Sequence, residues 1–196
     1  MKQTFAEQTK RAGLALAAVA LSALGTSTAL AQTFTTADLS INSVGFLECA
    51  FKETGLAPGA PVDYTCGATD VGWLTQCFIK NKPVSNIAPK LHVAHSADGL
   101  TSSRTFVATN RGTITNAILT AYPTVEETPH EEPLCPEVEG VTITEEITAI
   151  RWCNSLLADE TNIVDAEAPE LFLQLKRNGS ANIPSCEELA ILPTDI

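Results

Sequence analysis

Six cysteines constrain the fold of this chain more than any other feature of the sequence. An even number of cysteines in an oxidising compartment predicts disulfides, and six cysteines allow 15 pairings. The two that lie closest in sequence, Cys66 and Cys77, are too far apart for the C-x-x-C pairs of zinc sites. We therefore predict three disulfides and neither a metal site nor a cofactor. The cysteines are Cys49, Cys66, Cys77, Cys135, Cys153 and Cys186.

Residues 1–31 have the three parts of a secretory signal peptide. Basic side chains open the segment, residues 12–24 are almost entirely apolar, and Ala29-Leu30-Ala31 fits a signal-peptidase site. The apolar run is too short to span comfortably the roughly 30 Å of hydrocarbon in a bilayer. We predict cleavage after Ala31, a single mature domain over residues 32–196 without a membrane span, and a secreted location, either extracellular or periplasmic.

The predicted mature chain is strongly acidic. Removal of residues 1–31 lowers the basic residues from 12 to 9 and the acidic residues from 23 to 22, which leaves a formal charge of −13. Such a chain repels phosphate backbones and anionic membranes, and no cluster of lysine or arginine reverses the sign locally. Nucleic acid is therefore an unfavourable partner.

Alternation of apolar and polar residues dominates the first hundred residues after the signal. In the segment 46–51, Leu47, Cys49 and Phe51 share one face, and the segment 62–66 repeats the pattern. If these two strands fold symmetrically about the turn between them, Cys49 falls opposite Cys66, within disulfide reach. Elimination then favours Cys77–Cys135 and Cys153–Cys186.

Further short strands continue this pattern, with turn residues between them. This spacing predicts an all-β fold, an antiparallel β-sandwich of immunoglobulin-like type. The later strands are expected at 72–79, 90–95, 104–108, 113–121, 141–144 and 147–153.

Two segments depart from the strand pattern. Residues 123–136 hold four glutamates among prolines and predict a long acidic loop pinned by Cys135. Ser185-Cys-Glu-Glu188 matches a capping box and predicts a short C-terminal helix, tied down by Cys186. Residues 170–176 are compatible with either a strand or a helix.

Five short motifs occur in an order that resembles a loosely defined group of small secreted β proteins, mostly bacterial, of unknown function. The resemblance covers residues 38 to 160, and Cys153, Cys186 and the tail depart from it. It implies a sandwich and an extracellular location, and it brings no activity and no catalytic residue. The motifs are Cys49-Ala-Phe-Lys-Glu-Thr-Gly-Leu56, Val62-Asp-Tyr-Thr-Cys66, Cys77-Phe-Ile-Lys-Asn-Lys82, Asn110-Arg-Gly112 and Cys135-Pro136.

Several groups offer chemistry, each with a simpler structural interpretation. His92 and His95 point to opposite faces of a strand, so the two rings do not share a metal. The acidic loop carries oxygen ligands of the kind Ca²⁺ prefers, yet it has no calcium-loop motif. Trp73 and Trp152 are either core residues or exposed platforms for a sugar. The adjacent carboxylates at 145–146 and 159–160 diverge on a strand, which does not suit glycoside hydrolysis.

No Gly-x-Ser-x-Gly elbow is present, and no cysteine stays free if all six pair. The sequence therefore favours a secreted non-enzymatic domain with a role in surface interaction or binding, for an extracellular ligand that it does not identify. The alternative is a secreted hydrolase or hydrolase inhibitor whose site only the fold brings together.

Overall fold

The computed structural model describes residues 31–95, 100–123 and 135–194. The predicted signal peptide, apart from Ala31, and most of the predicted acidic loop lie outside these ranges. The described chain is built from antiparallel strands and one short helix, so the all-β prediction is confirmed. The finer assignment to an immunoglobulin-like type stays a prediction.

Two sheets make up the fold. The smaller sheet has the order β1-β2-β8, formed by β1 (Thr33–Ile41), β2 (Leu47–Thr54) and β8 (Thr113–Ala121). The larger sheet has the order β5-β4-β9-β3-β7, with β10 beside β9 and β6 beside β4. Its strands are β3 (Pro61–Gly67), β4 (Asp70–Ile79), β5 (Lys82–Pro83), β6 (Lys90–His95), β7 (Thr101–Val107), β9 (Thr144–Asp159) and β10 (Val164–Gln174).

The long strand β9 connects the two ends of the molecule. Its first half pairs with β4 and its last residues pair with β3, while β10 runs along its other edge. The change of partner coincides with Asn154, whose φ of 49° is left-handed, and with Pro169 at the skipped position of the β9–β10 ladder. Proline has no N–H to donate to a ladder. The ribbon therefore bends here.

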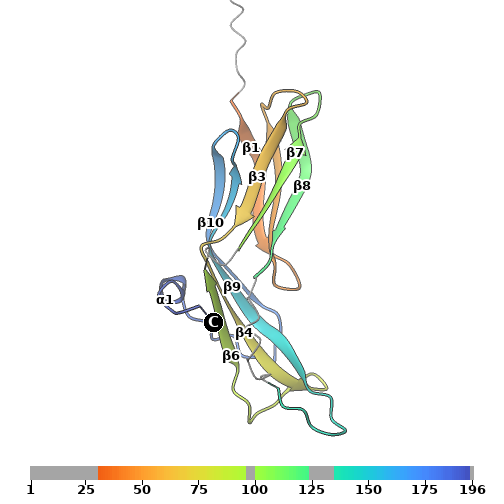
Figure 1. The fold of residues 1–196 in the computed structure, drawn as a ribbon, viewed down its shortest axis with the longest axis vertical. Helices are drawn as coiled ribbons and strands as arrows, with labels where there is room; N and C mark the ends of the chain where they lie inside the picture. The colour runs from red at the N-terminus through yellow and green to blue at the C-terminus, as the bar shows by residue number, and fades with distance from the viewer. Residues whose placement is uncertain (1–30, 96–99, 124–134, 195–196) are drawn as a thin grey trace, which may run out of the picture.

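The bend gives the molecule the elongated shape in Figure 1. At one end the β1-β2-β8 sheet faces β3, β7 and the β9–β10 hairpin, and we call this part the sandwich body. At the other end β4, β6 and the first half of β9 carry the helix α1 (Cys186–Leu189) on one face. We call this part the helix-covered sheet.

The apolar core of the sandwich body continues onto one face of β4 and β9, and a separate apolar cluster lies on the other face, under α1. Phe51 of β2, Tyr64 of β3 and Phe106 of β7 pack ring against ring inside the sandwich body, with centroids 4.5–5.7 Å apart. In the helix-covered sheet, Leu189 is the only buried residue of α1 and packs with Ile183 against the sheet. Alternation in β2 and β3 places the predicted faces inward, as their burial confirms.

The structure of the C-terminal region agrees with the prediction where the sequence contains a local motif. Ser185 and Glu188 form the predicted capping box at the start of α1. Residues 170–174, for which the sequence left helix and strand open, belong to β10. The strands β1 and the first half of β10 were not among the predicted strands. β1 lacks a regular apolar alternation and has a register shift near its start. The first half of β10 does alternate, from Val164 to Ala168, but its inward face is only half-buried and two of its three apolar side chains are small alanines.

Candidate functional site

The three disulfides join the pairs that the sequence favoured. Cys49–Cys66 lies in the core of the sandwich body, and both residues are fully buried. Cys77–Cys135 ties the end of the predicted acidic loop to β4. Cys153–Cys186 joins β9 to the first residue of α1. The described chain has no free cysteine.

Cys49 and Cys66 are bonded to each other as predicted, but their strands do not form the predicted hairpin. β2 pairs with β1 and β8, whereas β3 pairs with β7 and β9, so the two strands lie in different sheets. The disulfide crosses the sandwich, with a Cα–Cα distance of 6.0 Å. Residues 55–60 form an arch between sheets instead of a hairpin turn, and alternation along each strand cannot distinguish these two arrangements.

His92 is held on one face of β6. Its ring stacks on Trp73 of β4 with centroids 5.2 Å apart and an angle of 11° between the planes. Its Nε2 lies 2.9 Å from the Thr75 hydroxyl on the same face. The ring therefore joins two neighbouring strands.

His95 lies on the opposite face, as predicted. Its Nδ1 is 2.6 Å from Asp70 Oδ1, and its Nε2 is 2.9 Å from the carbonyl oxygen of Leu192 in the C-terminal segment. Thr69 donates to the other oxygen of Asp70. The Asp70 carboxylate and the Leu192 carbonyl both accept hydrogen bonds. A doubly protonated ring satisfies both contacts, because each of its two nitrogens then donates.

Both tryptophans belong to the core. Trp152 is fully buried and its indole N–H donates to the carbonyl of Gly45 at 3.0 Å, while Trp73 is 5 % exposed. Neither offers the exposed ring that stacking on a sugar requires.

A buried pair of carboxyl groups lies between the two sheets of the sandwich body. Glu53, in β2, is fully buried and accepts a hydrogen bond of 2.7 Å from the Tyr64 hydroxyl on its Oε2. Its Oε1 is buried without a donor. Asp159, at the end of β9, is 1 % exposed and lies within hydrogen-bonding reach of the Glu53 carboxyl.

Of these two carboxyl groups, Glu53 is the one whose ionised form its surroundings disfavour. Asp159 accepts from the backbone N–H groups of Thr161 and Asn162 and from the Asn162 side chain, so its negative charge is well compensated. Two carboxyl groups can share a hydrogen bond only when one of them is protonated. Burial above all raises the pKa of Glu53 to about 7, and the negative charge of Asp159 acts in the same direction.

This pair was missed in the sequence. Alternation along β2 places Glu53 on the same face as Cys49 and Phe51, which was a usable signal for a buried carboxyl. Asp159 was considered only with its neighbour Glu160. The two side chains do diverge, as expected, and Asp159 instead reaches a residue 106 positions earlier in the chain.

The other polar candidates lie apart from one another. Glu146 is paired with Lys176, and Glu145 is exposed. Asn178, in the glycosylation sequence Asn178-Gly-Ser180, is exposed in a turn after β10. His130 and the glutamates Glu126, Glu127, Glu131 and Glu132 of the predicted acidic loop lie outside the described residues.

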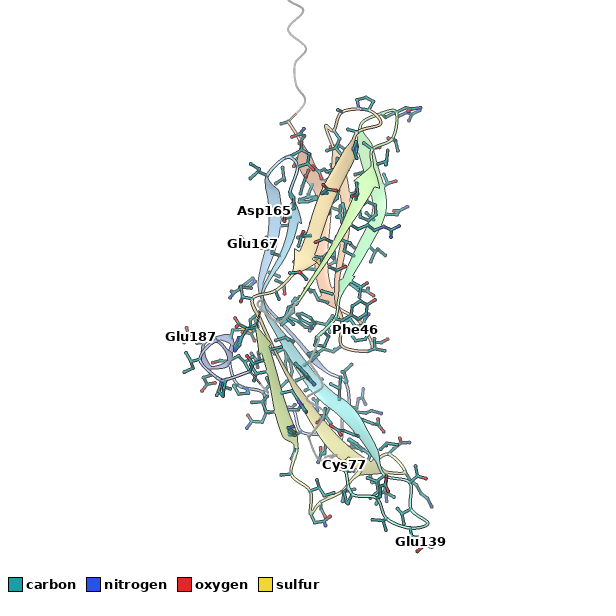
Figure 2. The ribbon with its side chains drawn as sticks, viewed as in Figure 1. Phe46, Cys77, Glu139, Asp165, Glu167 and Glu187 are labelled. Carbon is teal, nitrogen blue, oxygen red and sulfur yellow. A yellow bond between two sulfur atoms is a disulfide. The ribbon has the colours of Figure 1, made fainter. Side chains whose placement is uncertain are left out.

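The described surface carries open, shallow hollows. One lies over residues 135–143, one over 182–192, and one over Asp63, Thr65 and Ser103, and none of these three contains a histidine. Figure 2 shows Asp165 and Glu167 of β10 and Glu187 of α1 on one side of the molecule. In the described ranges, no three potential ligand side chains converge on a metal position.

No helix in the described part of the chain has the length and apolarity needed to cross a bilayer. No protein-family model matches the chain, and neither a curated protein nor a solved structure is significantly similar to it.

Proposed function

We propose that the mature chain is a secreted, non-enzymatic domain that binds an extracellular ligand or surface, with an immunoglobulin-like sandwich as its scaffold. The observation that carries this proposal is the use of the reactive side chains. In the described residues, both histidines, both tryptophans and the buried acid pair hold strands or segments of the chain together. The three disulfides support a location outside the cytoplasm, where such bonds persist.

The exposed acidic groups support a partner with positive charge. Asp165 and Glu167 line the outer face of β10, and Glu187 lies on the same side of the molecule. Complementary charge accelerates association more than it raises affinity. The association rate for binding through this side is therefore expected to fall as the salt concentration increases.

The alternative, a secreted hydrolase or hydrolase inhibitor, has one observation in its favour. The contact between Asp70 and His95 is of the kind that orients a catalytic histidine. In the folded chain, however, the second ring nitrogen faces the carbonyl of Leu192 rather than a serine or cysteine nucleophile.

The experiment uses purified protein that begins at Gln32, with disulfides intact. Saturable binding to the surface of intact cells of the producing organism, displaced by unlabelled protein, is the expected result. In parallel, ester, peptide and glycoside substrates are offered to wild type and to His95→Ala and His130→Ala variants. Turnover that disappears in either variant would replace the binding proposal with the hydrolase.

A further inference from the structure

We propose that the Glu53–Asp159 pair is a proton-operated lock, which holds the two sheets together where β1 begins in the sandwich body and loosens progressively as the pH rises to neutral. Glu53 belongs to the smaller sheet, and Asp159 and Tyr64 belong to the larger one. The hydrogen bond from Tyr64 to Glu53, together with a proton held on Glu53 beside Asp159, therefore connects two layers that the described residues do not join by backbone hydrogen bonds at this point.

Among the described residues, the charged group that acts most strongly on Glu53 is another carboxylate, Asp159, and not a cation. The groups that face Glu53 from the larger sheet are Tyr64, whose hydrogen bond favours the ionised form of Glu53, and Asp159, whose negative charge opposes it. The register partners of Glu53 in its own sheet are Phe34 of β1 and Ile114 of β8, which carry no charge. Ionisation leaves two carboxylates side by side in a buried, apolar site.

The structure shows which segments such a charge would loosen. Glu53 pairs with Phe34 near the beginning of β1, and Phe34 packs on the rings of Phe51 and Tyr64. Asp159 holds the turn over residues 159–163 through its three accepted hydrogen bonds. Water reaches Glu53 when the first residues of β1 and this turn move apart, whereas α1 and β6 lie at the other end of the molecule (Figure 1).

The expected change of the opening equilibrium with pH follows from proton linkage. Glu53 binds its proton more tightly in the closed form, with a pKa of about 7, than in an open form with the ordinary value of 4.5. Opening therefore becomes more favourable as the pH rises from 4.5 to 7 and levels off above. Between pH 5.5 and pH 8 the opening equilibrium should increase about 25-fold.

Amide hydrogen exchange of the mature protein at pH 5.5 and 8, corrected for the intrinsic effect of pH, measures this change. Loss of protection is expected over residues 33–36, 53–60 and 159–163, with little change over 72–79. Glu53→Gln, which keeps the shape and stays neutral, should remove the pH dependence. Glu48→Gln is the matched control, since Glu48 lies on the same strand, bonds Asn42 at the sheet surface and should leave the dependence intact.

The comparison between variants is essential because the chain also carries histidines, a residue type whose ordinary pKa of about 6.5 falls in this range. An unchanged pH dependence in Glu53→Gln, or a uniform loss of protection over both cores, overturns the proposal. A ¹³C titration of the Glu53 carboxyl in the wild-type protein gives an independent result if the variant does not fold. A midpoint close to 4.5 in that titration refutes the lock, and one close to 7 supports it.

Discussion

The contact between α1 and the sheet below it allows a stability prediction to be worked out from distances. Gly72 of β4 faces Leu189, and a Cβ atom built at Gly72 would lie 2.6 Å and 3.0 Å from the two methyl carbons of Leu189 and 3.3 Å from Ile183 Cγ2. Ordinary carbon–carbon contacts lie at about 3.5–4.0 Å. Because Leu189 is fully buried and follows the Cys153–Cys186 anchor, its side chain has little freedom to move away.

Gly72→Ala should therefore destabilise the protein. Alanine in a strand gains about 0.5–1 kcal/mol over glycine through its smaller backbone entropy, and overpacking costs about 1–3 kcal/mol. We expect a net loss of about 1–2 kcal/mol in the free energy of unfolding. Leu189→Ala alone should cost about 2–5 kcal/mol through lost burial and a cavity.

The double variant distinguishes this mechanism from a general weakening. With Leu189 truncated, the new methyl group enters vacated space, so Gly72→Ala/Leu189→Ala should be no less stable than Leu189→Ala alone. The expected coupling is about 2 kcal/mol. Urea unfolding with the disulfides intact, followed by the fluorescence of the two buried tryptophans, measures it.

Leu192→Ala provides the control, because Leu192 packs in the same cluster without being among the nearest contacts of the Gly72 position. Its effect should add to that of Gly72→Ala. Additive free energies for Gly72→Ala and Leu189→Ala, or a Gly72→Ala protein more stable than wild type, would show that the helix shifts freely and that the close approach does not determine stability.

Three further changes test other parts of the fold. Cys49→Ala/Cys66→Ala removes the bond between the sheets and should lower the free energy of unfolding by about 3 kcal/mol, as expected for a loop of this length, in urea titrations against wild type; a loss below 1 kcal/mol would contradict it. Trp152→Phe leaves the buried carbonyl of Gly45 without its donor and should cost about 1–3 kcal/mol in the same assay, with little change in far-ultraviolet circular dichroism. Lys176 holds the pKa of Glu146 below its usual value, so this pair stabilises the fold above the ordinary glutamate pKa and loses its effect as the pH falls through the lowered one. Glu146→Gln should therefore cost at most about 1 kcal/mol at pH 7 and nothing in strong acid, and added salt should reduce the difference.

Local sequence patterns were sufficient to predict much of the local structure of this protein. The alternation of β2 and β3 identified their buried faces, the odd spacing of His92 and His95 placed them on opposite faces, and the capping box located α1. Each of these properties depends on residues within a few positions of one another. The backbone geometry of a strand or helix is then enough to fix the outcome.

The assignment of strands to the two sheets depended on contacts between distant residues, which no local sequence pattern indicates. A strand with one buried face looks the same whether its neighbour in sequence lies beside it or opposite it, so Cys49–Cys66 was assigned to a hairpin although it crosses the sandwich. Only packing of the two sheets brought Asp159 to Glu53. Burial between layers then raised the pKa of a carboxyl that the sequence presented as one acidic residue among many.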